Sequence, residues 1–448
     1  MQKRVLPLIL ATAASVSSAN LYAQSFSSFD PRSMAMGGTG VAVSRPDTAS
    51  FFNPSLLSLP REDDNFSLQI PYIGAKFYDP DDFEDDLDTA QDAVDALDAT
   101  IAAIDAAASY TANDFNNLAS DTTNVNNALI SMDETLLHFE VGGGIAGGLP
   151  GEELGIGAYV NGRLMGSGIV NYEDSQTLDD LAQDATILAN CISAPPSCLN
   201  TLGDLTYITV SAGTITNPIN LSVNFDTDTD LTSTADLRGI LVSEVGISLS
   251  HSFDSFSLGI TPKYISIETF DYQATVENAD TDDFDGDDYI ESYSDFNIDL
   301  GISSKLKENV IIGLVVKNII EQEYETVQKD LLTPSEYKNR GGDMVLSPQA
   351  RVGIAYQTAW ALVAADLDLT KNKAIGYEED SQQLAVGAEF DALNVLQLRL
   401  GYKLDFEDSD RSTASAGLGV AFLGAHVDLA IAGNGDEIGG AMELGFSF

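Results

Sequence analysis

The stretch that decides the fold is GAMELGFSF, residues 440–448. Met442, Leu444, Phe446 and Phe448 are apolar, and the residues between them are small or polar. This period of two is the repeat of a β-strand with one apolar face. The stretch therefore predicts a strand whose two faces meet different surroundings.

The same alternation recurs through the C-terminal half of the chain, for example in residues 381–390 and 395–405. One face of each such strand is apolar, and the other carries Gly together with Arg, Lys, Asp and Glu. A soluble sandwich would bury the apolar face and expose the charged one. A transmembrane barrel does the opposite, with apolar residues toward lipid and polar or small residues toward the lumen.

The lengths of the connections decide between these two architectures. We predict strands near 65–77, 137–148, 154–172, 231–252, 256–276, 291–305, 309–322, 347–357, 360–370, 381–390, 395–405, 412–422, 425–432 and 438–448. Short and long connections alternate between them, as in bacterial outer-membrane barrels with short periplasmic turns. Residues 65–448 are therefore predicted to form an all-β, 14-stranded antiparallel transmembrane β-barrel, located in the bacterial outer membrane.

Composition excludes other classes of protein. The 448 residues include 69 acidic and 21 basic side chains, for a formal charge of −48. Such a surface repels the phosphate backbone of nucleic acids, so no nucleic-acid partner is expected. Hydrophobic residues make up 44% of the chain, which is far from the composition of disordered proteins.

The N-terminus has the layout of a secretory signal peptide. Lys3 and Arg4 precede the apolar run 5–14, and small residues follow. A membrane anchor is the alternative, but the run is short for a helix that spans a bilayer. We expect residues 1–23 to be removed on export. Cys191 and Cys198 are then expected to form a local disulfide in the long loop 173–230.

Residues 84–136 interrupt the strand pattern with a helical one. Apolar residues at 87, 90, 94, 97, 101, 104 and 108 follow a three–four spacing, and many Asp lie between them. A second, weaker series covers 118–136. The region is predicted to be an acidic helical hairpin in the first outward loop. Its role is either a solvated cap or spacer, which we favour, or a docking surface for a partner.

The segment before the first strand resembles the N-terminal signature of the FadL-like outer-membrane transport superfamily. The matching runs are DPRSMAMGGTGVAV at 30–43 and DTASFFNPSLL at 47–57, although Ser55-Leu56 departs from the usual Ala-Gly. The resemblance implies a hatch, residues 24–64, that plugs the barrel. Its candidate plug residues are Met36, Gly37, Gly38, Gly40, Asn53 and Pro54.

Within that superfamily the chain is most similar to the barrel family of conjugal transfer protein TraF. The similar runs are FED at 83–85, SPQARVG at 347–353, AADLDL at 364–369, LRLGY at 398–402 and TASAGLG at 413–419. The resemblance implies a channel for passive uptake of small hydrophobic molecules. The alternative is a structural barrel linked to conjugation or envelope assembly, with the helical insert as its docking surface.

Charged residues on the predicted lumenal face form the second candidate site. They are Arg351, Asp366, Asp368, Glu389, Arg399, Lys403, His426, Asp428 and Glu443. They could form ion pairs that hold the hatch or a polar path for a substrate, and pairing is favoured because isolated buried charges are costly. Expected partners are membrane lipid, a small hydrophobic ligand, and the assembly machinery that would read Phe446 and Phe448.

Catalytic and cofactor motifs do not emerge from the sequence. The three His residues are isolated, and no nucleophile or metal-protease motif accompanies them, so no enzyme activity and no cofactor are expected. Asp283 and Asp285 fit part of a calcium loop, but the ends of that loop carry the wrong residues. A solvated acidic loop is the preferred interpretation.

Overall fold

The fold is a closed β-barrel of 14 strands, in which each strand pairs antiparallel with both neighbours. The computed structural model describes residues 29–59, 66–81, 83–107, 109–193, 205–211, 220–226, 230–275, 289–326, 343–392 and 395–447. The barrel strands are β1 (Ser67–Tyr78), β2 (Leu136–Leu149), β3 (Gly155–Asn171), β6 (Thr234–Ser252), β7 (Ser257–Thr275), β8 (Ile290–Lys307), β9 (Val310–Lys317), β12 (Gln349–Gln357), β13 (Ala361–Asp368), β14 (Gln383–Ala392), β15 (Leu396–Asp405), β16 (Thr413–Phe422), β17 (Ala425–Gly433) and β18 (Glu437–Ser447). Each overlaps one predicted strand, so the predicted fold is confirmed.

The alternating sequence pattern separates the two faces of the barrel wall. In the β14–β15 pair, Leu400 lies opposite Ala388, and Arg399 lies opposite Glu389. Leu400 is 60% exposed on the outer surface, whereas Arg399 is 3% exposed inside. Large apolar side chains are exposed around the wall at Ile73, Val141, Val160, Ile247, Ile260, Leu300, Ile354, Val363, Val386, Leu400, Leu418, Ile431 and Met442. The barrel therefore has an apolar exterior and a polar interior.

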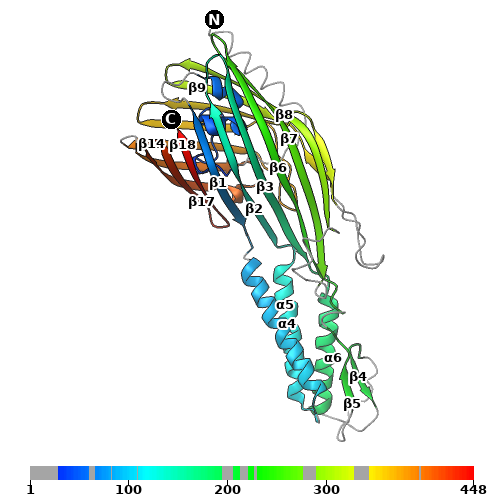
Figure 1. Cartoon of the computed structure of the whole chain (residues 1–448). Coiled ribbons are helices and arrows are strands. Elements are labelled where there is room, and N and C mark those ends of the chain that lie inside the picture. The colour runs from blue at the N-terminus through cyan, green and yellow to red at the C-terminus, as the bar shows by residue number, and fades with distance from the viewer. Residues whose placement is uncertain are drawn as a thin grey trace.

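The two ends of the barrel differ. Tight turns join the strands at one end, and the long connections lie at the other (Figure 1). The wall is also uneven in height, because β6 and β7 have 19 residues each whereas β9 and β13 have 8. Figure 1 shows β6, β7 and β8 extending toward the end that carries the helices. Among the described helices, none combines the length and apolarity needed to cross a bilayer.

A compact hatch, residues 29–59, lies inside the barrel (Figure 1). It contains α2 (Pro31–Ala35), α3 (Pro46–Phe52) and a 3-10 turn, η2 (Pro54–Ser58), each of which begins with a proline at a position that needs no backbone N–H donor. The Asp30 carboxylate caps α2 through the Ser33 N–H. The predicted signal peptide and the predicted hatch limits at 24 and 64 fall outside the described residues, so those boundaries remain predictions.

A helical stalk projects beyond the end with the long connections (Figure 1). It consists of α4 (Phe83–Asp105), α5 (Ala112–Met132) and α6 (Ser175–Ser193), with the hairpin β4 (Ile208–Ser211) and β5 (Asn220–Val223). Leu97, Phe115, Leu118 and Leu181 belong to a buried core that these elements share. The predicted helical hairpin is thus confirmed and corresponds to α4 and α5.

The connection 173–230 is not the plain long loop that we expected. Its first part forms α6, whose Leu178, Leu181, Ala185 and Leu188 are buried against α4 and α5. Their spacing of three and four residues is that of an amphipathic helix, and the stalk core covers the apolar side. Cys191 is buried in α6, whereas Cys198 lies outside the described residues. The predicted disulfide between them therefore stays a prediction.

A second inserted hairpin lies inside the barrel, on the stalk side. It is formed by β10 (Gln322–Glu325) and β11 (Asp343–Leu346), within the connection between β9 and β12. Tyr324, Met344 and Leu346 of the hairpin pack against inward-facing apolar residues of β3, β6 and β7. Part of the inner wall on the stalk side is therefore apolar and covered, rather than lined by water-facing polar groups.

Candidate functional site

The hatch is attached to the barrel wall by buried ion pairs. Arg32 of α2 contacts Glu389 of β14 through two nitrogens, at 2.8 and 2.9 Å. Arg399 of β15 reaches the same carboxylate at 2.6 Å and also contacts Asp428 of β17 at 2.5 Å. These bidentate and shared contacts are the strong, geometrically specific form of an ion pair. One wall carboxylate thus connects the hatch to two neighbouring strands.

A second guanidinium, that of Arg45, lies just before α3 and faces three carboxylates. It contacts Asp428 at 3.0 Å, Asp47 at 3.7 Å and Glu443 at hydrogen-bond distance. The three carboxylate side chains are at most 1% exposed. Because buried carboxylates without a counter-charge are strongly unfavourable, Arg45 is the shared counter-charge of this group.

Backbone groups of the hatch are held by further wall carboxylates. Asp366 of β13 accepts hydrogen bonds from the N–H groups of Gly40 and Val41, at 2.7 and 2.9 Å. Arg351 of β12 pairs with Asp368 and donates to the Gly38 carbonyl at 3.3 Å. The irregular backbone of the Gly37–Gly40 run therefore finds hydrogen-bond partners on the barrel wall.

Asn53 and Pro54 hold the other half of the hatch. The Asn53 side chain is fully buried, donates to the Val41 carbonyl at 2.8 Å and accepts from the Ser55 N–H at 3.2 Å. It thereby links the two halves of the hatch and caps η2. A side chain at Gly259 would collide with the backbone of Pro54 and Ser55. Glycine on the wall is what allows η2 to approach so closely.

The same arrangement recurs on the opposite wall. A Cβ atom at Gly387 or Gly401 would overlap Met36 or Gly37 of the hatch. A Cβ at Gly417 would overlap the Ala35 methyl group. The glycines that alternate with apolar residues in the strands therefore make room for the hatch, in addition to lining a lumen.

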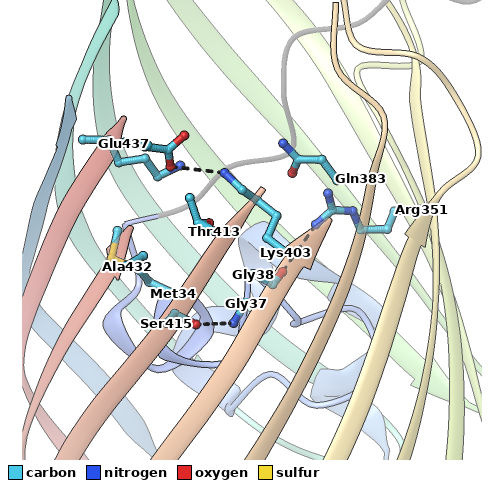
Figure 2. A pocket seen from close by; sticks show the side chains of 11 residues that line it. Met34, Gly37, Gly38, Arg351, Gln383, Lys403, Thr413, Ser415, Ala432 and Glu437 are labelled. Atoms are coloured by element: carbon cyan, nitrogen blue, oxygen red, sulfur yellow. Dashed lines mark hydrogen bonds and ion pairs between the residues drawn. The ribbon is translucent and has the colours of Figure 1, made fainter. Parts of the chain in front are cut away.

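A cavity borders the hatch near the ends of β1, β15 and β18 that meet the long connections, and Figure 2 shows the residues that line it. Its volume is about 40 Å³, and it is open to solvent. It is lined by Met34, Gly37, Gly38, Lys76, Arg351, Gln383, Lys403, Thr413, Ser415, Ala432 and Glu437. Figure 2 shows Lys403 and Glu437 facing each other across it, at 3.3 Å between charged atoms. Most of the lining side chains are polar, and three are cationic.

The connection between β13 and β14, residues 369–382, crosses the lumen; we call it the crossing loop. In the closed barrel, β13 and β14, which this loop joins, lie on the side opposite β2 and β3. Even so, the Tyr377 N–H donates to the Ser167 hydroxyl of β3 at 2.7 Å, and the Tyr377 ring faces Arg238 of β6 at 5.2 Å. The loop therefore spans the barrel and is attached to the far wall.

A buried carboxylate strengthens this attachment. Glu378 Oε2 lies 3.7 Å from Nδ1 of His138, at the start of β2. Burial acts to raise the pKa of Glu378, but the adjacent imidazole outweighs burial and holds this pKa at about 2. Glu378 is thus ionised at any physiological pH. Its side chain also accepts from the N–H groups of Ile375 and Gly376, which shapes the loop.

The structure places the lumenal residues predicted from sequence on the inner side of the wall. Eight of them, Arg351, Asp366, Asp368, Glu389, Arg399, His426, Asp428 and Glu443, lie along the hatch and its supporting network, and Lys403 lies in the cavity. Phe446 is half-buried on β18. Phe448 and the calcium candidates Asp283 and Asp285 lie outside the described residues.

The sequence analysis did not identify the residues of the hatch that take part in this network. Arg32 and Arg45 were not singled out, although they carry most of the ion pairs to the wall. A usable signal existed, because a chain with only 21 basic residues places two of them inside a short glycine-rich segment. Lys76 and Glu437 of the cavity were also missed.

One group of side chains has the composition of a metal site. Donor atoms of His426, Asp428 and Glu443 lie within 4.8 Å of one another. Both carboxylates, however, already pair with guanidinium groups, Asp428 with Arg399 and Arg45 and Glu443 with Arg45. These groups supply the positive charge that a metal ion would otherwise bring, so the geometry describes an ion-pair network.

Taken together, the closed wall, the apolar exterior and the internal hatch define a plugged β-barrel. The family model described as "F plasmid transfer operon, TraF, protein" matches residues 50–368. The chain therefore belongs to this TraF family, as the sequence resemblance indicated. No curated protein matches the chain.

Solved structures with a similar fold include hydrocarbon channels. The P. putida toluene transporter TodX is 12% identical, with a TM-score of 0.47, and the match covers 95% of this chain and 99% of that one. A TodX deltaS2S3 mutant, a monoaromatic hydrocarbon channel, is 12% identical with a TM-score of 0.47, and the match covers 93% of this chain and 98% of that one. The CymD monoaromatic hydrocarbon channel is 10% identical with a TM-score of 0.34, and the match covers 95% of this chain and 99% of that one. Likeness at this level does not specify a substrate.

Proposed function

We propose that this protein is an outer-membrane channel whose lumen is closed by the hatch. The observation that carries the proposal is the combination of an apolar outer surface with a polar lumen that a separate segment fills. Such a wall is stable only with lipid outside. The tight turns would face the periplasm, and the stalk would project from the cell.

We further propose that the substrates are small molecules with an apolar part, taken up passively. Two features support this. On the stalk side the inner wall is apolar at Ile240, Val242, Ile265 and Ile267, and a substrate would reach these residues where the β10–β11 hairpin moves away from them. The cavity beside the hatch then offers polar contacts, with Met34 as an apolar contribution. A purely hydrocarbon substrate would fit the first surface better than the second.

Deleting the hatch, residues 29–59, is expected to open the barrel. The chain without these residues should raise conductance in planar bilayers more than about tenfold over the intact protein, since a lumen of this strand number is otherwise wide. A double substitution, Arg32→Gln with Arg45→Gln, should give an intermediate effect. A heat-modifiability gel would confirm that each variant is a folded barrel. Folded variants with unchanged conductance would contradict the proposal that the hatch closes the lumen.

A second candidate function is linked to the family description, which refers to a plasmid transfer operon. We propose that the stalk docks an envelope partner during conjugation. The observation that favours this is a stalk with its own buried core and an acidic surface, in which Asp88, Asp92 and Asp95 are exposed. A cap over the barrel mouth would not need to project from it.

Reversing that acidic surface tests the docking role. The triple variant Asp88→Lys, Asp92→Lys and Asp95→Lys should lower conjugation frequency at least about tenfold, because complementary charge steers and orients encounters between proteins. The triple Asp→Asn variant is the matched control and should have a smaller effect. Unchanged conjugation at equal outer-membrane levels would contradict the docking role and leave the channel proposal untouched.

A further inference from the structure

We propose that the stalk controls the crossing loop, so that a partner docked on the stalk releases this loop from the far wall of the lumen. The proposal joins the two proposed functions and rests on both, because it makes access to the lumen depend on what the stalk binds. It is carried by the position of the loop's anchors, by the joint between the stalk and the barrel, and by the way the loop is attached.

The anchors of the crossing loop form one row across three neighbouring strands. In the register of the barrel, His138 of β2 lies opposite Ser167 of β3, and Ser167 lies opposite Arg238 of β6. These three side chains contact Glu378 and Tyr377 of the loop. The attachment of the loop therefore depends on how β2, β3 and β6 are placed relative to one another at this level.

The same three strands carry the stalk. Helix α5 leads into β2, β3 leads into α6, and the chain returns from the stalk into β6. At the stalk ends of β3 and β6, Asn171 lies opposite Thr234, four residues beyond Ser167 and Arg238. At about 3.3 Å per residue, the row of anchors is roughly 13 Å from this joint. A displacement of the stalk thus acts on the strand ends that position the anchors.

The joint between the stalk and the barrel is packed and hydrogen-bonded. Met132 of α5 and Val170 of β3 belong to one buried cluster at the base of the stalk. The Asp174 carboxylate, just before α6, accepts from the backbone N–H groups of Thr232 and Ser233, just before β6, at 2.9 and 2.7 Å. Because close-packed elements transmit strain, such a joint passes a tilt of the stalk on to β3 and β6.

The crossing loop is attached by contacts that lie outside the strand pairing of the barrel. The Tyr377 N–H and the Glu378 carboxylate contact side chains of the wall, and Ile375 packs against the apolar cluster of the inner wall. A Cβ atom at Gly376 would collide with the Ser167 hydroxyl, so a small shift of β3 alters this contact. The loop is therefore able to detach while the wall stays closed, which is a local opening.

The test is hydrogen–deuterium exchange of the refolded full-length barrel in detergent, followed by mass spectrometry. The N–H groups of Ile375, Gly376 and Tyr377 are hydrogen-bonded in the attached loop, so their exchange rates report how often the loop opens. His138→Gln should raise these rates at least about tenfold, as expected for the loss of a charge-assisted contact. His251→Gln, which alters an exposed histidine near the tight turns, is the matched control and should leave them unchanged.

Two buried aspartates test the control by the stalk. Asp174→Asn weakens the joint and should raise the exchange rates of the loop at least about threefold, the effect of losing one ordinary hydrogen bond. Asp184 of α6 is the matched control, because its carboxylate accepts from the N–H groups of Thr206 and Tyr207 within the stalk. Asp184→Asn should leave the loop unchanged. Asn171→Ala removes a hydrogen bond to Asp236 across the same joint and guards against misfolding of Asp174→Asn.

Loop exchange that His138→Gln leaves unchanged would overturn the proposal, as would equal loop exchange in the two aspartate variants. Hatch exchange at Gly40 and Val41 is followed in the same samples, and an equal rise there would also overturn it, because the whole barrel would have loosened. The measurement involves neither transport nor a partner. Faster loop exchange in Asp174→Asn would retain the link even with conductance or conjugation unchanged, and its absence would leave both proposed functions standing.

Discussion

Replacing Arg45 by methionine is expected to lower the free energy of unfolding by about 3–5 kcal/mol, the loss typical when one partner of a buried ion pair is removed. Methionine keeps much of the volume but leaves Asp428, Glu443 and Asp47 near one another without their shared counter-charge. Chemical unfolding of the protein refolded in lipid vesicles measures the change. The hatch should also be released, so that conductance rises in the same preparation.

The control for Arg45 is Lys371, which forms a simple ion pair with Glu407 at 2.6 Å. The Lys371 side chain is 50% exposed, so Lys371→Met should change stability by less than about 1 kcal/mol. Comparing the two variants separates the effect of burying an ion pair from the effect of merely having one. If the free energy of unfolding fell only slightly in both variants, the hatch would be held by packing alone. The ion-pair network would then have no part in closing the barrel.

The barrel could be predicted from the sequence because its wall obeys a local rule. Each strand alternates between an apolar outer face and a polar or small inner face, so the period of two is visible in a few residues, and the turn lengths supply the topology. The stalk hairpin was predicted for a similar reason, since α4 carries its apolar residues at helical spacing. The same rule applies to α6, whose Leu178 and Leu181 pattern was overlooked in a region expected to be a loop.

The partners of the hatch could not be predicted in this way. Arg32 and Glu389 are 357 residues apart in the sequence, and no local pattern connects them. The inner glycines show the same difficulty. A small residue at Gly401 suits any lumen, and only the structure shows that Gly37 of the hatch lies against it. What a strand faces inside the barrel depends on another part of the chain, whereas the apolar outer face follows from the alternation within the strand itself.

The second large effect is expected on the lipid face of β15. Leu400→Arg should cost roughly 2–4 kcal/mol, because it places a charge against hydrocarbon near the middle of the strand. Leu400 is 60% exposed on the outer surface and pairs with Ala388 and Ala416, which offer no counter-charge. Unfolding in lipid vesicles is again the measurement.

The control for Leu400 has to lie on the inner face of the same strand. Arg399 is unsuitable because it pairs with Glu389 and Asp428, and Gly401 is unsuitable because a side chain there would strike the hatch. Gln397 is half-buried and lies two residues before Arg399, so both side chains are on the inner face. Gln397→Arg should therefore lower the free energy of unfolding much less. A one-residue slip in register exchanges the two faces. If Gln397→Arg were the severe change and Leu400→Arg the mild one, β15 would be inside out, and a lipid-facing exterior could not be maintained for this barrel.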